Sequence, residues 1–186
     1  MILRAAALTL ASLLTAPTAP AAVAGPAAPA IVDQADHVGD VNVFDGGGTK
    51  PTTAQRKTID LERFSVTAVG DGIRLSFRIA RITRSRTYDQ IVTAQLRTPG
   101  KDGLLLDVLA NPQGRHATAY VDDDTICLAD VSTAQRTGTV RVDLPGGCVP
   151  HGSGVLRVTT YTQEKNGSGP GFSEDTMRVR GLVNLR

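Results

Sequence analysis

The residues of this chain best suited to bind or react are aspartates, which gather in two short segments. The first segment opens the predicted fold around Gly39 and contains Asp33, Asp36 and Asp40. The second segment is a single acidic loop that contains Asp122, Asp123 and Asp124. Ca²⁺ takes about six to eight oxygen ligands, often Asp carboxylates and loop carbonyls. Two such segments at one end of a fold predict a structural calcium site.

Solvated turns are the alternative interpretation of both acidic segments. Asp is a common turn former, and neither segment has the fixed Gly and Glu positions of an EF-hand loop. The sequence therefore leaves open whether calcium is a cofactor or whether there is none.

The three histidines, His37, His116 and His151, form no pattern that predicts chemistry. They are scattered, and no pair has the spacing of a zinc site. Ser153 lies in Gly152-Ser153-Gly154, which is not the G-x-S-x-G motif of a hydrolase nucleophile. We therefore expect no catalytic residues and favour a non-enzymatic binding or interaction domain with an unknown ligand. A small secreted hydrolase or inhibitor remains an alternative.

Carbohydrate binding is a further alternative, in the form of a calcium-stabilised sugar-binding module. Sugar faces stack on exposed aromatic rings, but the chain contains no Trp. The tyrosines Tyr88, Tyr120 and Tyr161 are the candidates with a polar group at the ring edge. Half-burial at a sheet face is the commoner place for such tyrosines.

Two cysteines, Cys127 and Cys148, predict a disulfide, because an even count in an exported chain favours pairing. Closing a loop of this length stabilises the fold by about 3 kcal/mol in the chain-entropy model. Two free thiols are the alternative. C-x-x-C spacing, which would indicate a redox-active pair, is absent.

Export is predicted from residues 1–24, which have the pattern of a secretory signal peptide. Arg4 supplies the positive charge, residues 5–14 are mostly apolar, and Ala22-Val23-Ala24 predicts cleavage before Gly25. The apolar stretch is shorter than the roughly 20 residues that a membrane span requires. With no Cys near the cleavage site and no apolar tail at the C-terminus, we expect a secreted, extracellular protein without a membrane anchor.

The remainder divides into a flexible Pro/Ala-rich lead-in at residues 25–30 and a single domain at residues 31–186. The formal net charge is only +2, which argues against binding to nucleic acid or to membrane surfaces. The short basic run of Arg81, Arg84 and Arg86 is interpreted as a solvated loop. We expect a monomer whose partner is an unknown extracellular ligand.

Short alternating runs separated by turn residues predict an all-β fold to position these groups. In residues 59–69 the apolar phase changes, which predicts a bulge near Glu62-Arg63. Gly70-Asp71-Gly72 predicts a tight hairpin turn. The residues that follow alternate strictly and point inward at Ile73, Leu75, Phe77 and Ile79.

About nine or ten strands are expected in total, with no long amphipathic helix. Besides residues 59–69 and 73–79, strands are predicted at 40–44, 88–98, 104–110, 116–121, 125–131, 139–144, 155–162 and 177–185. Two packed antiparallel sheets would protect so many strands better than one open sheet. The predicted fold is a two-sheet antiparallel β-sandwich, possible in jelly-roll form, and a closed barrel is the alternative.

Three short motifs carry a resemblance to a known group. They are Asp36-x-x-Gly39-Asp40-Val41, Leu144-Pro145-x-x-Cys148 and Val155-Leu156-Arg157-Val158. Together with the Ala-rich leader, the chain resembles uncharacterised secreted β-sandwich proteins of actinobacterial type. This resemblance implies an extracellular sandwich with a cysteine pair, and it implies no activity or catalytic residues.

Overall fold

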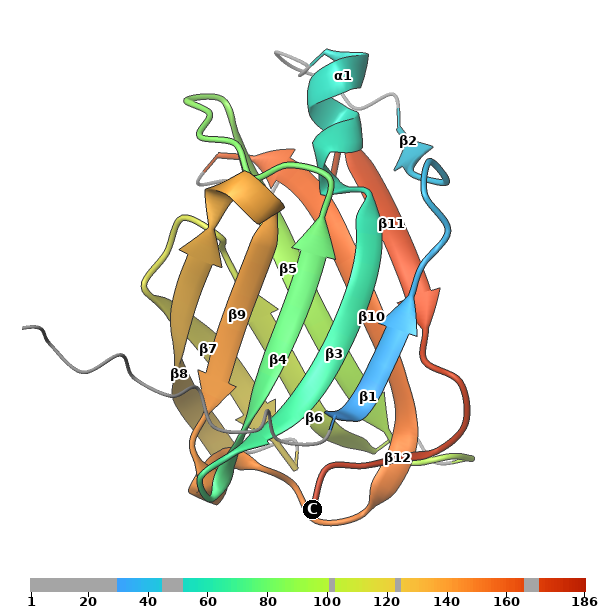
Figure 1. The fold of residues 1–186 in the computed structure, drawn as a ribbon, viewed down its shortest axis with the longest axis vertical. Coiled ribbons are helices and arrows are strands. Elements are labelled where there is room, and N and C mark those ends of the chain that lie inside the picture. The colour runs from blue at the N-terminus through green and yellow to red at the C-terminus, as the bar shows by residue number, and fades with distance from the viewer. Residues whose placement is uncertain (1–29, 45–51, 101–102, 123–124, 166–170) are drawn as a thin grey trace, which may run out of the picture.

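The computed structural model describes residues 30–44, 52–100, 103–122, 125–165 and 171–186. The predicted signal peptide, nearly all of the lead-in, and Asp123 and Asp124 lie outside the described residues. Within them the fold is all-β and antiparallel, as the sequence predicted, with a single turn of α-helix at one end (Figure 1). No helix of the described residues is long and apolar enough to cross a membrane.

Twelve strands and four short helical segments make up the described chain. The strands are β1 (Ala30–Ala35), β2 (Asn42–Val43), β3 (Leu61–Val69), β4 (Gly72–Ile79), β5 (Tyr88–Arg97), β6 (Leu104–Ala110), β7 (His116–Val121), β8 (Thr125–Ala134), β9 (Thr139–Leu144), β10 (Ser153–Glu164), β11 (Ser173–Arg178) and β12 (Val183–Asn184). The α-helix is α1 (Thr53–Arg56), and the 3-10 segments are η1 (Lys57–Ile59), η2 (Gln135–Thr137) and η3 (Gly146–Cys148).

These strands form one continuous sheet that curls around its own core. The order is β1-β3-β4-β9-β8-β7-β6-β5-β10-β11-β2, with β12 beside β10. Strand β8 joins the two halves, because Thr125–Asp130 pairs with β7 and Asp130–Ala134 pairs with β9. We call β1, β3, β4 and β9 the front half and β5, β6, β7, β10 and β11 the back half (Figure 1). The predicted division into two separate sheets is not confirmed, since the backbone ladder continues through β8.

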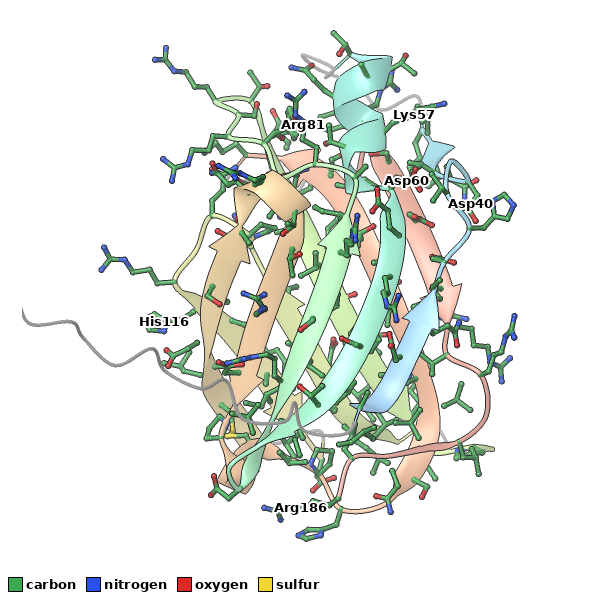
Figure 2. All side chains as sticks on the ribbon, viewed as in Figure 1. Asp40, Lys57, Asp60, Arg81, His116 and Arg186 are labelled. Carbon is green, nitrogen blue, oxygen red and sulfur yellow. A yellow bond between two sulfur atoms is a disulfide. The ribbon has the colours of Figure 1, made fainter. Side chains whose placement is uncertain are left out.

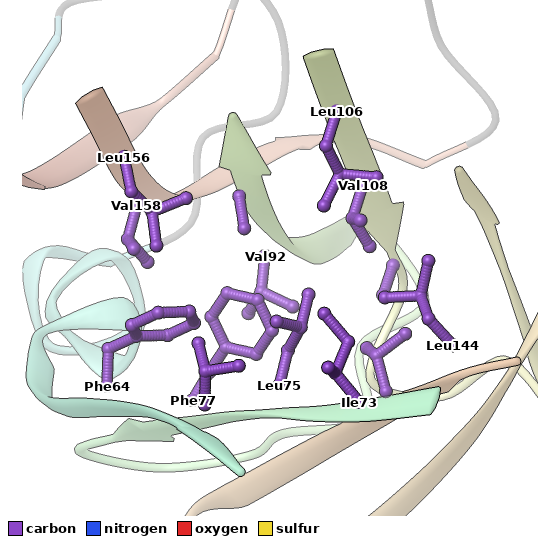
Figure 3. Close-up of a cluster of buried hydrophobic side chains, with 14 of the residues drawn as sticks. Phe64, Ile73, Leu75, Phe77, Val92, Leu106, Val108, Leu144, Leu156 and Val158 are labelled. Atoms are coloured by element: carbon purple, nitrogen blue, oxygen red, sulfur yellow. The ribbon is translucent and has the colours of Figure 1, made fainter. Parts of the chain in front are cut away.

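The core fills the space between the two halves, with side chains from each half pointing toward the other (Figure 3). The predicted inward set of β4 is confirmed: Ile73, Leu75, Phe77 and Ile79 are all buried. Phe77 packs against Phe64 of β3 with ring centroids 5.1 Å apart. A core of this kind gives the back half a rigid support for whatever its outer face carries.

The predicted bulge is confirmed in β3, where the pairing with β4 shifts register between Leu61 and Arg63. The extra residue, Glu62, lets the apolar residues on either side of the bulge face the same core. The last predicted strand differs from the structure. Residues 177–185 are interrupted at Gly181, which has φ +77°, so β11 ends at Arg178 and only β12 follows.

The predicted disulfide is present between Cys127 and Cys148, with Cα atoms 6.1 Å apart. It links β8 to η3, which follows β9. The bond therefore fixes the corner at which the front half continues into the back half.

Candidate metal centre

The two ends of the curled sheet meet along a seam where no backbone ladder joins β3 to β10 and β11 (Figure 1). Side chains bridge this seam instead. The Leu61 backbone N–H donates to Oδ2 of Asp175 at 2.6 Å, and Thr160 Oγ1 donates to the Ile59 carbonyl at 2.5 Å. Backbone groups that would otherwise lie buried and unpaired are satisfied in this way.

Four aspartates from three separate segments converge at the seam. Asp40, Asp60 and Asp175 each place a carboxylate oxygen within 4.8 Å of the other two. The charge of Asp36 acts on Asp175, and the charges of Asp40 and Asp60 act on Asp36, so Asp36 belongs to the same cluster. Figure 2 shows Asp40 and Asp60 near the end of the molecule that carries α1 and β2. We call these four residues the aspartate cluster.

The connection between β1 and β2 delivers two of the four carboxylates through a turn at Gly39. This glycine has φ +95°, a conformation that residues with a Cβ rarely adopt. Its backbone N–H donates to both carboxylate oxygens of Asp60, at 3.0 and 2.8 Å. The turn thereby places Asp36 and Asp40 over Asp60.

Strand β11 delivers the fourth carboxylate by the alternation of an ordinary strand. Ser173, Asp175 and Met177 face inward, while the residues between them are exposed. Asp175 is only 2% exposed. A carboxylate therefore occupies a position that the pattern of the strand reserves for the core.

The electrostatics of the cluster are those of carboxylates gathered without a counter-charge. Burial raises the pKa of Asp175 to about 6, the charges of Asp40, Asp36 and Asp60 raise it further, and the Leu61 N–H opposes them. Burial also raises the pKa of Asp36, whose Oδ2 is buried and has no hydrogen-bond partner among the described residues. No Lys or Arg of the described residues forms an ion pair with any of the four.

This arrangement suits a hard divalent cation. Ca²⁺ binds oxygen at about 2.3–2.6 Å, so ligand oxygens on opposite sides of one ion lie about 5 Å apart. The 4.8 Å limit among the carboxylates of Asp40, Asp60 and Asp175 fits that requirement. The group contains no His or Cys, the ligands that structural zinc sites use.

The structure brings together only part of the acidic set that the sequence singled out. Asp36 and Asp40 lie in the cluster, whereas Asp33 forms a bidentate pair with Arg63 at 2.6 and 2.5 Å. That guanidinium lowers the pKa of Asp33. Asp122 follows β7 with φ +50°, and its N–H donates to the Leu105 carbonyl at 3.2 Å, so the neighbour it engages lies in β6 and outside the cluster.

Sequence reasoning missed Asp60 and Asp175. Asp175 had a usable signal, because it has the same parity as Met177 and Val179, so a carboxylate was due on the core face of a strand. Asp60 directly precedes the buried Leu61 at the start of β3, but Asp residues before strands are common turn formers. Their convergence depends on how the sheet curls.

The other candidate residues lie apart from one another. His116 Nδ1 is 3.4 Å from Asp130 Oδ1 on an exposed surface, and His151 Nε2 lies 2.8 Å from an Arg186 nitrogen. No Ser among the described residues hydrogen-bonds to either histidine. Arg81, Arg84 and Arg86 are exposed, in agreement with the predicted solvated loop.

The three tyrosines have different surroundings. Tyr88 is buried with its hydroxyl 3.0 Å from Thr83 Oγ1, whereas Tyr120 and Tyr161 reach the outer surface of the back half. Comparison with known proteins adds nothing to the geometry: no family model, curated protein or solved structure matches the chain.

Proposed function

We propose that this protein is a non-enzymatic extracellular binding domain stabilised by one Ca²⁺ ion in the aspartate cluster. The observation that carries the proposal is Asp175, a carboxylate that is 2% exposed and surrounded by three others with no basic partner among the described residues. Burying like charges together is costly unless an ion compensates them. A bound divalent cation supplies that compensation.

The cation has a structural role in this proposal, because its ligands come from both sides of the seam. Asp60 precedes β3 of the front half, Asp175 lies in β11 of the back half, and Asp36 and Asp40 lie in the β1–β2 connection. One ion would hold the two halves together as the two layers of a sandwich. Extracellular calcium modules bind with dissociation constants of about 10⁻⁴ to 10⁻³ M, which matches a role outside the cell.

The test is the melting temperature of the protein in excess Ca²⁺ and in chelator at pH 7.5, with calorimetric titration of Ca²⁺. Binding to the folded state alone stabilises by about 2.7 kcal/mol when Ca²⁺ is 100 times its dissociation constant. We expect a clear rise in melting temperature with Ca²⁺ and a stoichiometry near one.

Asp175→Asn should abolish the Ca²⁺-dependent rise, and the variant should fold, because it removes a buried charge that destabilises the metal-free protein. Asp122→Asn is the matched control, since Asn tolerates its positive φ and Asp122 engages β6 instead of the cluster. Identical melting curves with and without Ca²⁺ in the parent protein would overturn the proposal. Loss of the rise in Asp122→Asn would also overturn it.

The extracellular and non-enzymatic parts of the proposal rest on other observations. The leader pattern of residues 1–24 and the disulfide support export, and the lack of a grouped Ser, His and Asp among the described residues supports binding over catalysis. Mass spectrometry of the expressed protein should give an N-terminus at Gly25. Turnover of a glycoside, ester or peptide panel that one point substitution abolishes would overturn the non-enzymatic assignment.

A further inference from the structure

The outward face of the back half carries a group of arginines that the fold itself does not use. Arg97 of β5, Arg157 of β10 and Arg178 of β11 are exposed and line a hollow of about 410 Å³. Arg157 and Arg178 are directly paired across the β10–β11 ladder. Arg97 lies opposite Val155, two residues before Arg157 on β10.

These three arginines differ from the arginines of the front half. There, Arg63 pairs with Asp33, Arg74 with Asp143 and Arg78 with Glu62, at distances of 2.5 to 2.8 Å. Among the described residues, Arg97, Arg157 and Arg178 form no ion pair or side-chain hydrogen bond. Like charges directly opposite each other in a ladder destabilise a sheet. An anionic group from outside the chain would remove that cost.

A second hollow of about 460 Å³ adjoins the first and shares Gln95 and Arg157 with it. Its floor is polar and includes Thr93, Thr159 and Asp107, with the half-buried Tyr161 on β10. The Tyr161 hydroxyl has no hydrogen-bond partner among the described residues, although its ring is partly packed. A ring with a free hydroxyl beside Thr, Gln and Asp side chains matches a sugar, which offers an apolar face and many hydroxyl groups.

An extended peptide suits this face less well. Strand addition requires an unpaired edge, but β5 is paired with β6 and β10, and β10 is paired with β5 and β11. A ligand must therefore be recognised by side chains standing on the sheet. The side chains present are guanidiniums at one end and a Tyr with small polar groups at the other.

We propose that this face binds a carboxylate-bearing polysaccharide, with Arg157 and Arg178 pairing with uronate carboxylates and Tyr161 packing against a neighbouring sugar ring. Guanidinium and carboxylate groups match in a bidentate geometry, which gives both strength and orientation. We call Arg97, Arg157, Arg178 and Tyr161 the uronate face. The inference rests on the proposed function only in taking the chain to be a binding domain.

The test is affinity electrophoresis and calorimetric titration of the full chain with polygalacturonate. A neutral glucan and poly-glutamate of similar length serve as comparison ligands. The double variant Arg157→Gln/Arg178→Gln should weaken binding by roughly tenfold or more, the effect of losing charge-assisted hydrogen bonds. Tyr161→Ala should also weaken binding. Arg141→Gln is the control, because Arg141 is an exposed arginine of β9 on the front half.

The arginine variants should fold, since removing the opposed charges of Arg157 and Arg178 relieves repulsion. We expect their melting temperature to equal or exceed that of the parent protein. Equal affinity for poly-glutamate would overturn the inference, because it would show a charge effect without sugar recognition. Absence of polygalacturonate binding, or an equal loss in Arg141→Gln, would also overturn it.

The failure of this inference can be told apart from failure of the proposed calcium site. The Ca²⁺-dependent melting shift is measured without polysaccharide, and the titrations with polygalacturonate are made in chelator. A protein with the melting shift but no polygalacturonate binding overturns only the uronate face. A protein with polygalacturonate binding but no melting shift overturns only the calcium site.

Discussion

The curled sheet turns back on itself in two different ways on its two sides. At β8 the backbone ladder runs without interruption from β7 to β9, and the Cys127–Cys148 disulfide lies beside that corner. At the seam, β3 meets β10 and β11 through side chains such as Asp175 and Thr160. The same core lies behind both sides.

The difference shows what a fold gains by closing with side chains in place of backbone. A ladder satisfies its own polar groups and carries no net charge. The seam instead gathers the aspartate cluster, so its stability depends on protons and cations. We expect perturbations of the core and of the β8 corner to be independent of Ca²⁺, and perturbations of the seam to depend on it.

The largest effect should come from the core, which supports both sides equally. Phe77→Ala removes a fully buried ring that packs on Phe64, and such changes cost about 3–5 kcal/mol. Urea unfolding should show the same loss in Ca²⁺ and in chelator. Ser76→Ala, on the opposite face of β4, is the control and should cost little. A loss that varied with Ca²⁺ would mean that core and seam are not separable.

The next effect concerns the β8 corner. Replacing both Cys127 and Cys148 by Ala should destabilise the protein by about 3 kcal/mol, according to the chain-entropy model for a loop of this length. The loss should be measured by urea unfolding in Ca²⁺ and in chelator, and should be the same in both. Because the chain has only these two cysteines, added reductant should reproduce the loss in the parent protein and change nothing in the variant.

A smaller effect should follow from the turn that places two carboxylates over Asp60. Gly39→Ala forces a Cβ into φ +95° and should cost about 1–2 kcal/mol, with weaker Ca²⁺ binding in calorimetric titration. A Cβ at Gly39 meets no atom within 4 Å, so the cost is in the backbone. Gly147→Ala is the control, since it also meets nothing there and has no positive φ. Unchanged Ca²⁺ affinity would show that the turn does not position the cluster.

The smallest effect is a dependence on pH that reverses with Ca²⁺. The pKa of Asp175 is raised to about 6 in the folded state, so its stabilising contribution is complete below its unfolded value of about 4 and is lost as pH rises through 6. In chelator, lowering the pH from 7 to 5 should stabilise the parent protein relative to Asp175→Asn by about 1 kcal/mol.

In Ca²⁺ the trend should reverse, because protons compete with the cation for the carboxylates. Melting temperatures at pH 5, 6 and 7 for both proteins measure this. If the metal-free parent and Asp175→Asn showed the same pH profile, Asp175 would not be the titrating group at the seam.

Much of the fold followed from local patterns. The alternation of Ile73, Leu75, Phe77 and Ile79 placed β4, and the change of phase in β3 located the bulge, because both depend on which face of a strand is buried. The end of the chain was harder to predict, since Gly181 interrupts a run that hydrophobicity alone would continue. Whether the strands form one sheet or two depends on β8, whose two ladders have no local signal.

The sequence by itself determined the strands, the inward faces and the cysteine pair, because burial alternation and redox chemistry act on neighbouring or countable residues. It also indicated that Asp36, Gly39 and Asp40 belong together, since a single turn holds them. Only the tertiary structure decided that Asp60 and Asp175 complete the cluster and that Asp33 instead pairs with Arg63. The physical reason is that carboxylates distant in sequence meet only where the curled sheet returns to its starting edge.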